Sequence, residues 1–262
     1  MKTCFVPFLA FLLITGCDSR FRDDLDYSYD VVQSWTIEEI PSGDLVQFES
    51  VDFDLIASVT IRQAIAKDNV AASRDVLHIG SGVGLISAMC LNYEAKSVVA
   101  TDIHPAAVSN TRYNVAALAP DGKLTTRLRP ASKQDAFSAI ESDEKFDLII
   151  TDLDQNHRLG EREDDGGLRT FAESFFGGFS SHLNSGGRAI VICSKPETLN
   201  LLLQTCKANG LKAKSLEEDF ENRDWESADS PMIPAVLFEV RPDAGTPVGT
   251  TAQHLFLAKH GN

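Results

Sequence analysis

Clusters of basic residues are missing from this sequence. Its 262 residues include 24 Lys and Arg against 38 Asp and Glu, which gives a formal net charge of −14 at pH 7. A surface of that sign repels phosphate backbones. Nucleic acid is therefore disfavoured as a partner, and small molecules or proteins are better candidates.

Cysteine and histidine patterns typical of metal or disulfide sites are also missing. Cys90, Cys193 and Cys206 stand among apolar neighbours, as small buried hydrophobic residues do. The sequence contains no Cys-x-x-Cys pair, histidine cluster or zinc-ligand spacing. It therefore predicts neither a disulfide framework nor a metal site, and no residue is assigned as a metal ligand.

The sequence begins with an apolar run that is too short to cross a membrane as a permanent helix. This run, Phe5 to Ile14, precedes the small residues Thr15 and Gly16, as in a signal peptide. Ile14-Thr-Gly-Cys17 resembles the bacterial lipobox, which implies a signal peptide at 1–16 and lipidation of the Cys17 thiol. We therefore expect a lipoprotein anchored to a membrane on the extracytoplasmic face. A cytoplasmic protein with a chance hydrophobic start is the alternative.

One strand, glycine loop, helix and strand unit dominates the rest of the chain. The apolar spacing changes from a short run at 75–79 to a helical period at 85–95, with a glycine turn between them. Glycine lets a ligand approach the backbone where a Cβ would collide. The strand at 97–102 then ends in Asp102, which is placed to accept hydrogen bonds from two ribose hydroxyls. The unit predicts a nucleoside ligand.

The glycine spacing narrows the choice of nucleoside. A dinucleotide loop needs a third glycine where Leu85 stands, and a nucleoside triphosphate loop needs a Gly-Lys-Ser/Thr ending that is absent. The Gly80-Ser-Gly-Val-Gly84 stretch resembles the first motif of the class I S-adenosylmethionine-dependent methyltransferases. The resemblance implies S-adenosyl-L-methionine as the cofactor, with its methionine part beside the loop and its ribose on Asp102. A glycine turn in an ordinary α/β domain is the alternative.

Further cofactor contacts follow from the same resemblance. Ile103 would cover one face of the adenine, and Asp135 would bind the adenine amino group. For Asp135, a role as a solvated loop acid or a helix cap is an equal alternative. His78 stands where many relatives place an acid that reaches toward the methionyl end. The predicted cofactor-binding residues are His78, Gly80, Ser81, Gly82, Gly84, Asp102, Ile103 and Asp135.

Candidate catalytic residues follow the strand at 146–152. In an open parallel sheet, groups just beyond the carboxyl ends of central strands face the ligand crevice. Asp152 is therefore the first candidate, with a turn-capping role as the alternative. Asp154 and His157 follow at short spacing and could act as a base or contact the substrate.

Alternating strands and helices from Asp75 to Ala258 predict an α/β fold with a doubly wound sheet. The resemblance implies that this is the mostly parallel, seven-stranded methyltransferase sheet with helices on both faces. The methyltransferase domain is expected at 51–262, with an insertion at about 217–251 and two antiparallel last strands, 213–216 and 254–258. A tether and a hairpin around Pro41-Ser-Gly43 would occupy 17–50. A helix within 52–66 would roof the pocket. Further helices are predicted at 106–118, 171–183 and 199–208.

Within that superfamily the chain resembles the small-domain methyltransferases, through Asp135-Ala-Phe137 and His182-Leu-Asn-Ser-Gly-Gly187. Those relatives have Asn-Pro-Pro-Tyr/Phe after the fourth strand, where this chain has Thr151-Asp-Leu-Asp154, which argues against amide and base N-methylation. We expect a methyltransferase that acts on a small molecule or a protein side chain. An aminopropyltransferase-like enzyme and a non-catalytic lipoprotein binding module are the alternatives, and the oligomeric state is not predicted.

Overall fold

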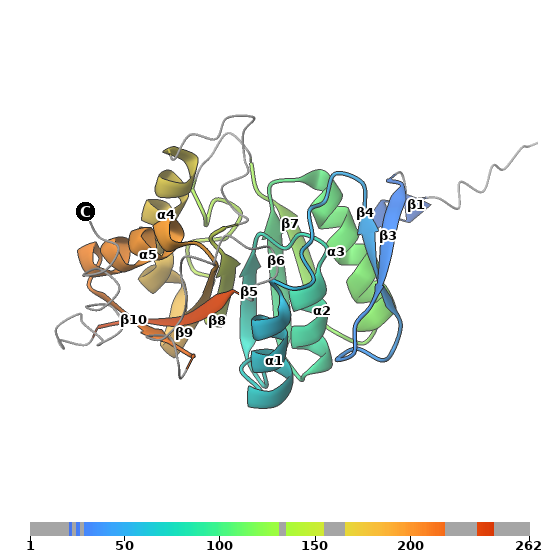
Figure 1. Cartoon of the computed structure of the whole chain (residues 1–262), viewed down its shortest axis with the longest axis horizontal. Coiled ribbons are helices and arrows are strands. Elements are labelled where there is room, and N and C mark those ends of the chain that lie inside the picture. The colour runs from blue at the N-terminus through green and yellow to red at the C-terminus, as the bar shows by residue number, and fades with distance from the viewer. Residues whose placement is uncertain are drawn as a thin grey trace, which may run out of the picture.

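The computed structural model describes residues 21–22, 25–26, 29–130, 135–154, 166–217 and 235–243. A seven-stranded sheet in the order β10-β11-β9-β8-β5-β6-β7 forms its centre (Figure 1). The strands are β5 (Asp75–Ile79), β6 (Ser97–Asp102), β7 (Leu124–Leu128), β8 (Phe146–Asp152), β9 (Leu183–Cys193), β10 (Leu211–Ser215) and β11 (Val236–Pro242). The predicted doubly wound α/β sheet is confirmed.

The strand pairing creates one crevice at the edge of the sheet. β5 pairs in parallel with β6 on one side and with β8 on the other, while β11 runs antiparallel to both β9 and β10. The chain therefore winds outward in both directions from β5. Ligands of such sheets bind outside the carboxyl ends of the strands at this reversal point. The ends of β5, β6 and β8 are accordingly the place to look for a site.

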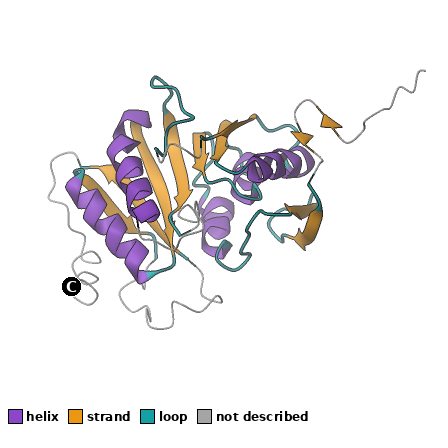
Figure 2. Cartoon of the chain, turned by 90° about the horizontal axis from the view of Figure 1, so that it is seen from above, coloured by secondary structure: helices purple, strands orange, loops and turns teal. Residues whose placement is uncertain are grey.

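Helices cover both faces of the sheet (Figures 1 and 2). Successive strand residues point to opposite faces, so Val76 belongs to one apolar core and Leu77 to the other. Burial on both faces explains why these strands read as continuous apolar runs. The first core contains α1 (Val59–Asp68), α2 (Leu85–Asn92) and α3 (Pro105–Leu118), and the second contains α4 (Gly166–Gly178) and α5 (Pro196–Ala208).

An N-terminal hairpin packs against α3. Strands β3 (Val31–Thr36) and β4 (Asp44–Phe48) pair antiparallel, which confirms the predicted hairpin, and a shorter pair, β1 (Phe21–Arg22) and β2 (Leu25–Asp26), precedes them. Asn110 of α3 accepts a hydrogen bond from Phe48 N at 2.9 Å, and Asn114 accepts one from Val46 N at 2.9 Å. Buried amides need such partners. The two asparagines therefore fix the hairpin on the domain.

Several element boundaries differ from the sequence prediction. α1 begins at Val59 rather than near Asp52, and α4 begins at Gly166 and continues into a short 3₁₀ helix, η1 (Phe179–His182). β9 begins at Leu183, the last residue of the helix predicted at 171–183. The strand begins this early because Leu183 already pairs with Phe146 of β8.

The stretch predicted as a polar insertion contains a strand. The partner of β10 is β11 at 236–242, inside the stretch assigned to a polar insertion, where the apolar run Val236-Leu-Phe238 provides both buried faces. The antiparallel pairing itself was predicted. The strand expected at 254–258 lies outside the described residues.

The predicted signal peptide and lipidation site precede the described residues. Residues 1–16 and Cys17 lie outside the described residues. Within the described part of the chain, no helix combines the length and the apolar composition needed to cross a membrane. Cys90, Cys193 and Cys206 are buried with free thiols, as the sequence predicted.

Candidate functional site

The glycine loop between β5 and α2 has a backbone that side chains would disturb. Gly82 has φ of 52° and Gly84 has φ of 85°, in the left-handed region that favours glycine. A Cβ on Gly84 would lie 2.6 Å from the Cα of Thr111. A Cβ on Gly82 would meet only the carbonyl oxygen of Asp52, at 3.8 Å. The loop is therefore packed tightly on its α3 side and open beside Gly82.

Polar residues of α3 hold this loop in place. The Thr111 hydroxyl lies 2.9 Å from Ser81 Oγ and 3.1 Å from the carbonyl oxygen of Gly82. Asn114 donates to the carbonyl oxygen of Val83 at 2.7 Å. The glycine loop is thus preorganised by side chains that lie below it.

Asp102 ends β6 directly beside the loop. Its Oδ2 accepts a hydrogen bond from Gly82 N at 3.0 Å, and its Oδ1 accepts one from His104 N at 2.9 Å. A carboxylate oxygen can accept two hydrogen bonds. Each oxygen of Asp102 therefore keeps acceptor capacity for a ribose hydroxyl, in a fixed orientation.

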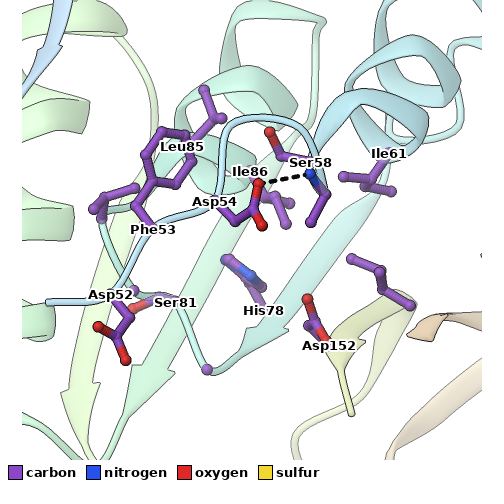
Figure 3. A pocket seen from close by; sticks show the side chains of 15 residues that line it. Asp52, Phe53, Asp54, Ser58, Ile61, His78, Ser81, Leu85, Ile86 and Asp152 are labelled. Carbon is purple, nitrogen blue, oxygen red and sulfur yellow. Dashed lines mark hydrogen bonds between the residues drawn. The ribbon is translucent and has the colours of Figure 1, made fainter. Parts of the chain in front are cut away.

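A pocket of about 100 Å³ opens next to the glycine loop (Figure 3). Its roof comes from the segment that leads into α1, as the sequence predicted, although most of the roof residues precede the helix itself. The lining residues are Asp52, Phe53, Asp54, Ala57, Ser58, Ile61, His78, Gly80, Ser81, Gly82, Val83, Leu85, Ile86, Asp152 and Ile192. The pocket therefore joins the predicted methionine side of the cofactor site to Asp152.

His78 places an uncharged ring in this pocket. The side chain is only 2% exposed, and its Nδ1 lies 2.9 Å from Ser87 Oγ of α2. Burial lowers the pKa of His78 to about 4, so the imidazole is neutral at physiological pH. In Figure 3 the His78 ring and the Asp152 side chain both point into the pocket. Where many relatives place an acid, this chain places a neutral hydrogen-bonding group.

Two aspartates at the carboxyl end of β8 have different surroundings. Asp152 lines the pocket, and its Oδ1 accepts a hydrogen bond from Asp154 N at 2.9 Å. Asp154 is 6% exposed and accepts hydrogen bonds from Ser194 N, from Ser194 Oγ at 2.6 Å and from Thr198 Oγ1. The Asp154 carboxylate thus joins the end of β8 to the start of α5. The catalytic role of Asp154 stays a prediction, and His157, the third candidate, lies outside the described residues.

The residues expected at the adenine lie away from this pocket. Ile103 follows Asp102 at the carboxyl end of β6 and is half-buried. Asp135 is exposed, and its Oδ1 accepts hydrogen bonds from Phe137 N at 3.0 Å and Ser174 Oγ at 3.0 Å. The loop-capping role that the sequence left open for Asp135 is therefore present. Its adenine role stays a prediction.

The sequence profile of the methyltransferase small domain family matches residues 51–215. The chain belongs to this family. No curated protein sequence matches the chain. A Clostridium thermocellum protein described as an rRNA methylase shares the fold, with a TM-score of 0.50 and 14% identity over 74% of this chain and 100% of its own.

Two further solved structures are similar in fold. The ribosomal protein L11 methylase of Lactobacillus delbrueckii subsp. bulgaricus has a TM-score of 0.49 at 17% identity, over 74% of this chain and 83% of its own. The N-methyltransferase NodS of Bradyrhizobium japonicum, solved with S-adenosyl-L-homocysteine, has a TM-score of 0.45 at 14% identity, over 70% of this chain and 84% of its own.

The site fits the cofactor of a small-domain methyltransferase. The open space at Gly82 admits a ligand against the backbone, and Asp102 is fixed beside it with acceptor capacity for the ribose. The pocket beyond the loop is lined largely by apolar groups with His78 and Asp152 among them. S-adenosyl-L-methionine is therefore assigned as the cofactor of this methyltransferase domain.

Sequence reasoning missed several residues of this site. The segment 52–66 was predicted to roof the pocket, but none of its residues was singled out, because Asp52, Phe53, Asp54 and Ser58 carry no recognisable motif. Thr111 and Asn114 read as ordinary polar residues of an amphipathic helix. Their roles depend on the packing of α3 against a loop almost thirty residues earlier, which no local pattern reveals.

Proposed function

We propose that this small-domain methyltransferase transfers a methyl group from S-adenosylmethionine to a small molecule or a protein side chain. The observation that supports the proposal is the shared pocket of the glycine loop and Asp152. The cofactor supplies an electrophilic methyl group, and an acceptor bound near Asp152 would face it. The acceptor and the methyl group would thereby be held close together, which supplies much of the rate enhancement in such reactions.

Each residue of the site would have a role that follows from its position. Asp102 would bind the ribose, and the roof from Asp52 to Ser58 would exclude water from the reacting atoms. Asp152 would orient the acceptor and remove its proton, a task that carboxylates and imidazoles perform in many enzymes. His78, neutral because of its lowered pKa, would offer a second uncharged hydrogen-bonding group on the same pocket wall.

The charge of the chain favours an acceptor other than RNA. One of the similar structures is described as an rRNA methylase, and others are tRNA methyltransferases. This chain carries a net charge of −14, and it lacks the Asn-Pro-Pro-Tyr/Phe motif that clamps planar amines in the family it resembles. RNA would have to overcome that repulsion. A small molecule or a protein side chain is the better candidate.

A second candidate function is aminopropyl transfer. The pocket is lined by Asp52, Asp54 and Asp152, and by neither lysine nor arginine among the described residues. Carboxylates favour a ligand that carries an aliphatic ammonium group. A decarboxylated form of the cofactor would have such a group and would lack the carboxylate that these acids repel. A non-catalytic lipoprotein binding module that retains the fold is the remaining alternative.

Isothermal titration of the full chain tests these candidates. We expect S-adenosylmethionine and S-adenosylhomocysteine to bind, and Asp102→Ala to weaken both by about 100-fold, because two charge-assisted hydrogen bonds to the ribose are lost. Tighter binding of decarboxylated S-adenosylmethionine would favour aminopropyl transfer. Absence of heat with all three ligands on folded protein would reject the enzyme proposals.

A further inference from the structure

Arg129 is a buried cation at the same edge of the sheet as the proposed cofactor site. It follows β7 directly, and its backbone N–H donates to the carbonyl oxygen of Asp102 at 2.7 Å. The side chain is only 1% exposed. Its Nε and Nη1 atoms have no hydrogen-bond partner within the described part of the chain. Neither the family match nor the sequence motifs assign a role to this residue.

The surroundings of Arg129 hold the guanidinium without satisfying its donors. Its Cζ lies 5.2 Å from the centre of the Phe171 ring of α4, so the guanidinium makes a cation–π contact with that ring. The N–H groups point outward in the plane and still need acceptors. Burial lowers the pKa of Arg129, while Asp102 and Asp135 raise it. An arginine stays charged under these conditions, so the cation remains with unused donors.

The two acids nearest to Arg129 are the two assigned to the nucleoside. Asp102 is placed for the ribose hydroxyls, and the family resemblance points Asp135 at the adenine amino group. Carboxylates can only accept hydrogen bonds from a ligand. A nucleoside also brings acceptors of its own, the ribose oxygens and the ring nitrogens of the base. A free phosphate would provide acceptors as well, but the two neighbouring carboxylates would repel it.

We propose that Arg129 is a binding residue for the nucleoside part of the cofactor, where it donates hydrogen bonds to an acceptor atom of the ribose or the base. This inference rests on the proposed function, because it presumes that the nucleoside lies along Asp102. Arg129 supplies the donors that Asp102 and Asp135 lack. Through Phe171 for Arg129 and Ser174 for Asp135, α4 supports both members of this polar edge.

The test compares Arg129 with Arg127, which lies two residues earlier, on β7. Arg129→Met removes the buried guanidinium and keeps most of its length. Arg127→Met is the matched control, because Arg127 is paired with Glu144 at 2.7 Å and is not placed at the site. Both variants are titrated with S-adenosylhomocysteine and with adenosine, after circular dichroism and melting temperature establish that they fold.

We expect Arg129→Met to weaken both ligands by the same factor, roughly 10- to 100-fold, because adenosine contains the whole of the proposed contact. Arg127→Met should leave both dissociation constants within about twofold. Arg129→Lys should recover only part of the affinity, since an ammonium cannot reproduce the planar fork. Unchanged affinity in folded Arg129→Met, or a loss confined to S-adenosylhomocysteine, would overturn the proposal.

Nucleoside analogues identify the acceptor and test the proposal on the unmodified protein. Wild type is titrated with 1-deaza-, 3-deaza- and 7-deazaadenosine for the base, and with 2′-deoxy- and 3′-deoxyadenosine for the ribose. One analogue should lose affinity in wild type and show a much smaller loss in Arg129→Met. If every analogue shows the same loss in both proteins, Arg129 makes no such contact. Wild type that binds neither adenosine nor S-adenosylhomocysteine would instead reject the proposed function itself.

Discussion

At the scale of single residues, two neighbouring aspartates differ in the groups that surround their carboxylates. The Asp154 carboxylate accepts hydrogen bonds from Ser194 and Thr198, whereas Asp152 lines the pocket. Both carboxylates lie at the carboxyl end of β8, so their sequence positions suggest the same role. Their different surroundings predict different effects when each is replaced by the isosteric amide.

Asp152→Asn should reduce turnover by at least about 100-fold, because the amide cannot accept a proton from the acceptor. Its affinity for S-adenosylhomocysteine should stay within about twofold, since the cofactor site is intact. Asp154→Asn should instead lower the free energy of unfolding by about 2 kcal/mol through the loss of buried hydrogen bonds. Steady-state kinetics, titration and urea unfolding measure the three effects. Equal turnover of Asp152→Asn and wild type would remove Asp152 from the mechanism.

His78 should make the stability of the protein depend on pH. Its pKa is about 4 in the folded state and 6.5 for an unperturbed imidazole, so the unfolded chain binds more protons between these values. The free energy of unfolding therefore falls as the pH drops from about 6.5 toward 4, and is fully retained above that window. The two values limit the loss to about 3 kcal/mol.

Urea unfolding of wild type and His78→Gln at pH 7, 6 and 5 measures this effect. Other groups titrate in both proteins, so the difference between the two curves isolates His78. Wild type should lose more stability than the variant at each step down in pH. Parallel curves would mean that His78 is not buried in its neutral form.

At the scale of elements, α3 connects the N-terminal hairpin to the glycine loop. Asn110 bonds to β4 through Phe48 N and through Val46 O at 2.8 Å. Asn114 bonds to Val46 as well, but it also donates to Val83 O in the glycine loop. The hairpin and the cofactor site therefore share one side chain.

This arrangement predicts that Asn114→Ala and Asn110→Ala differ in ligand binding. Each variant should lose about 2 kcal/mol of unfolding free energy, because each leaves buried backbone groups of β4 without partners. Only Asn114→Ala should also weaken S-adenosylhomocysteine, by roughly tenfold, since it releases the glycine loop. Urea unfolding and titration give the two quantities. A similar affinity for both variants would show that the loop keeps its shape without Asn114.

At the scale of the whole molecule, we propose a membrane anchor at Cys17, which precedes the described residues in the sequence. A lipidated Cys17 would be joined to the hairpin by a short acidic tether, and each buried acyl methylene would contribute about 0.8 kcal/mol to membrane binding. Several acyl chains together hold a protein on a membrane stably. This lipoprotein proposal also raises the question of cofactor supply, because S-adenosylmethionine is made in the cytosol.

Fractionation of cells that express the full chain tests the anchor. Wild type should be found with membranes and should incorporate labelled fatty acid, while Cys17→Ser should lose the label. Some unlabelled Cys17→Ser could stay on the membrane through its uncleaved signal, so lipid labelling is the decisive measurement. Soluble wild-type protein that still begins at Met1 would contradict the lipobox interpretation and would place the enzyme with its cofactor.

The parallel sheet, the glycine loop and Asp102 could be predicted from local sequence. These features depend on neighbours in the chain: apolar runs for strands buried on both faces, glycines for positive φ, and an acid at a strand end. Strand β11 was missed because its apolar run stands alone between polar stretches, without a helix to mark it. Only pairing with β9 and β10 reveals it.

The contacts of the polar side chains, and which of them line the pocket, depend on tertiary packing. The Asp154 carboxylate accepts a hydrogen bond from Ser194, which lies forty residues later in the chain. Arg129 follows β7, yet it contacts Asp102 at the end of β6 and Phe171 of α4. The roof residues reach the pocket because the hairpin is docked on α3. Hydrogen-bond satisfaction and burial depend on which segments meet in space, and that is set by the packing of the whole chain rather than by local sequence.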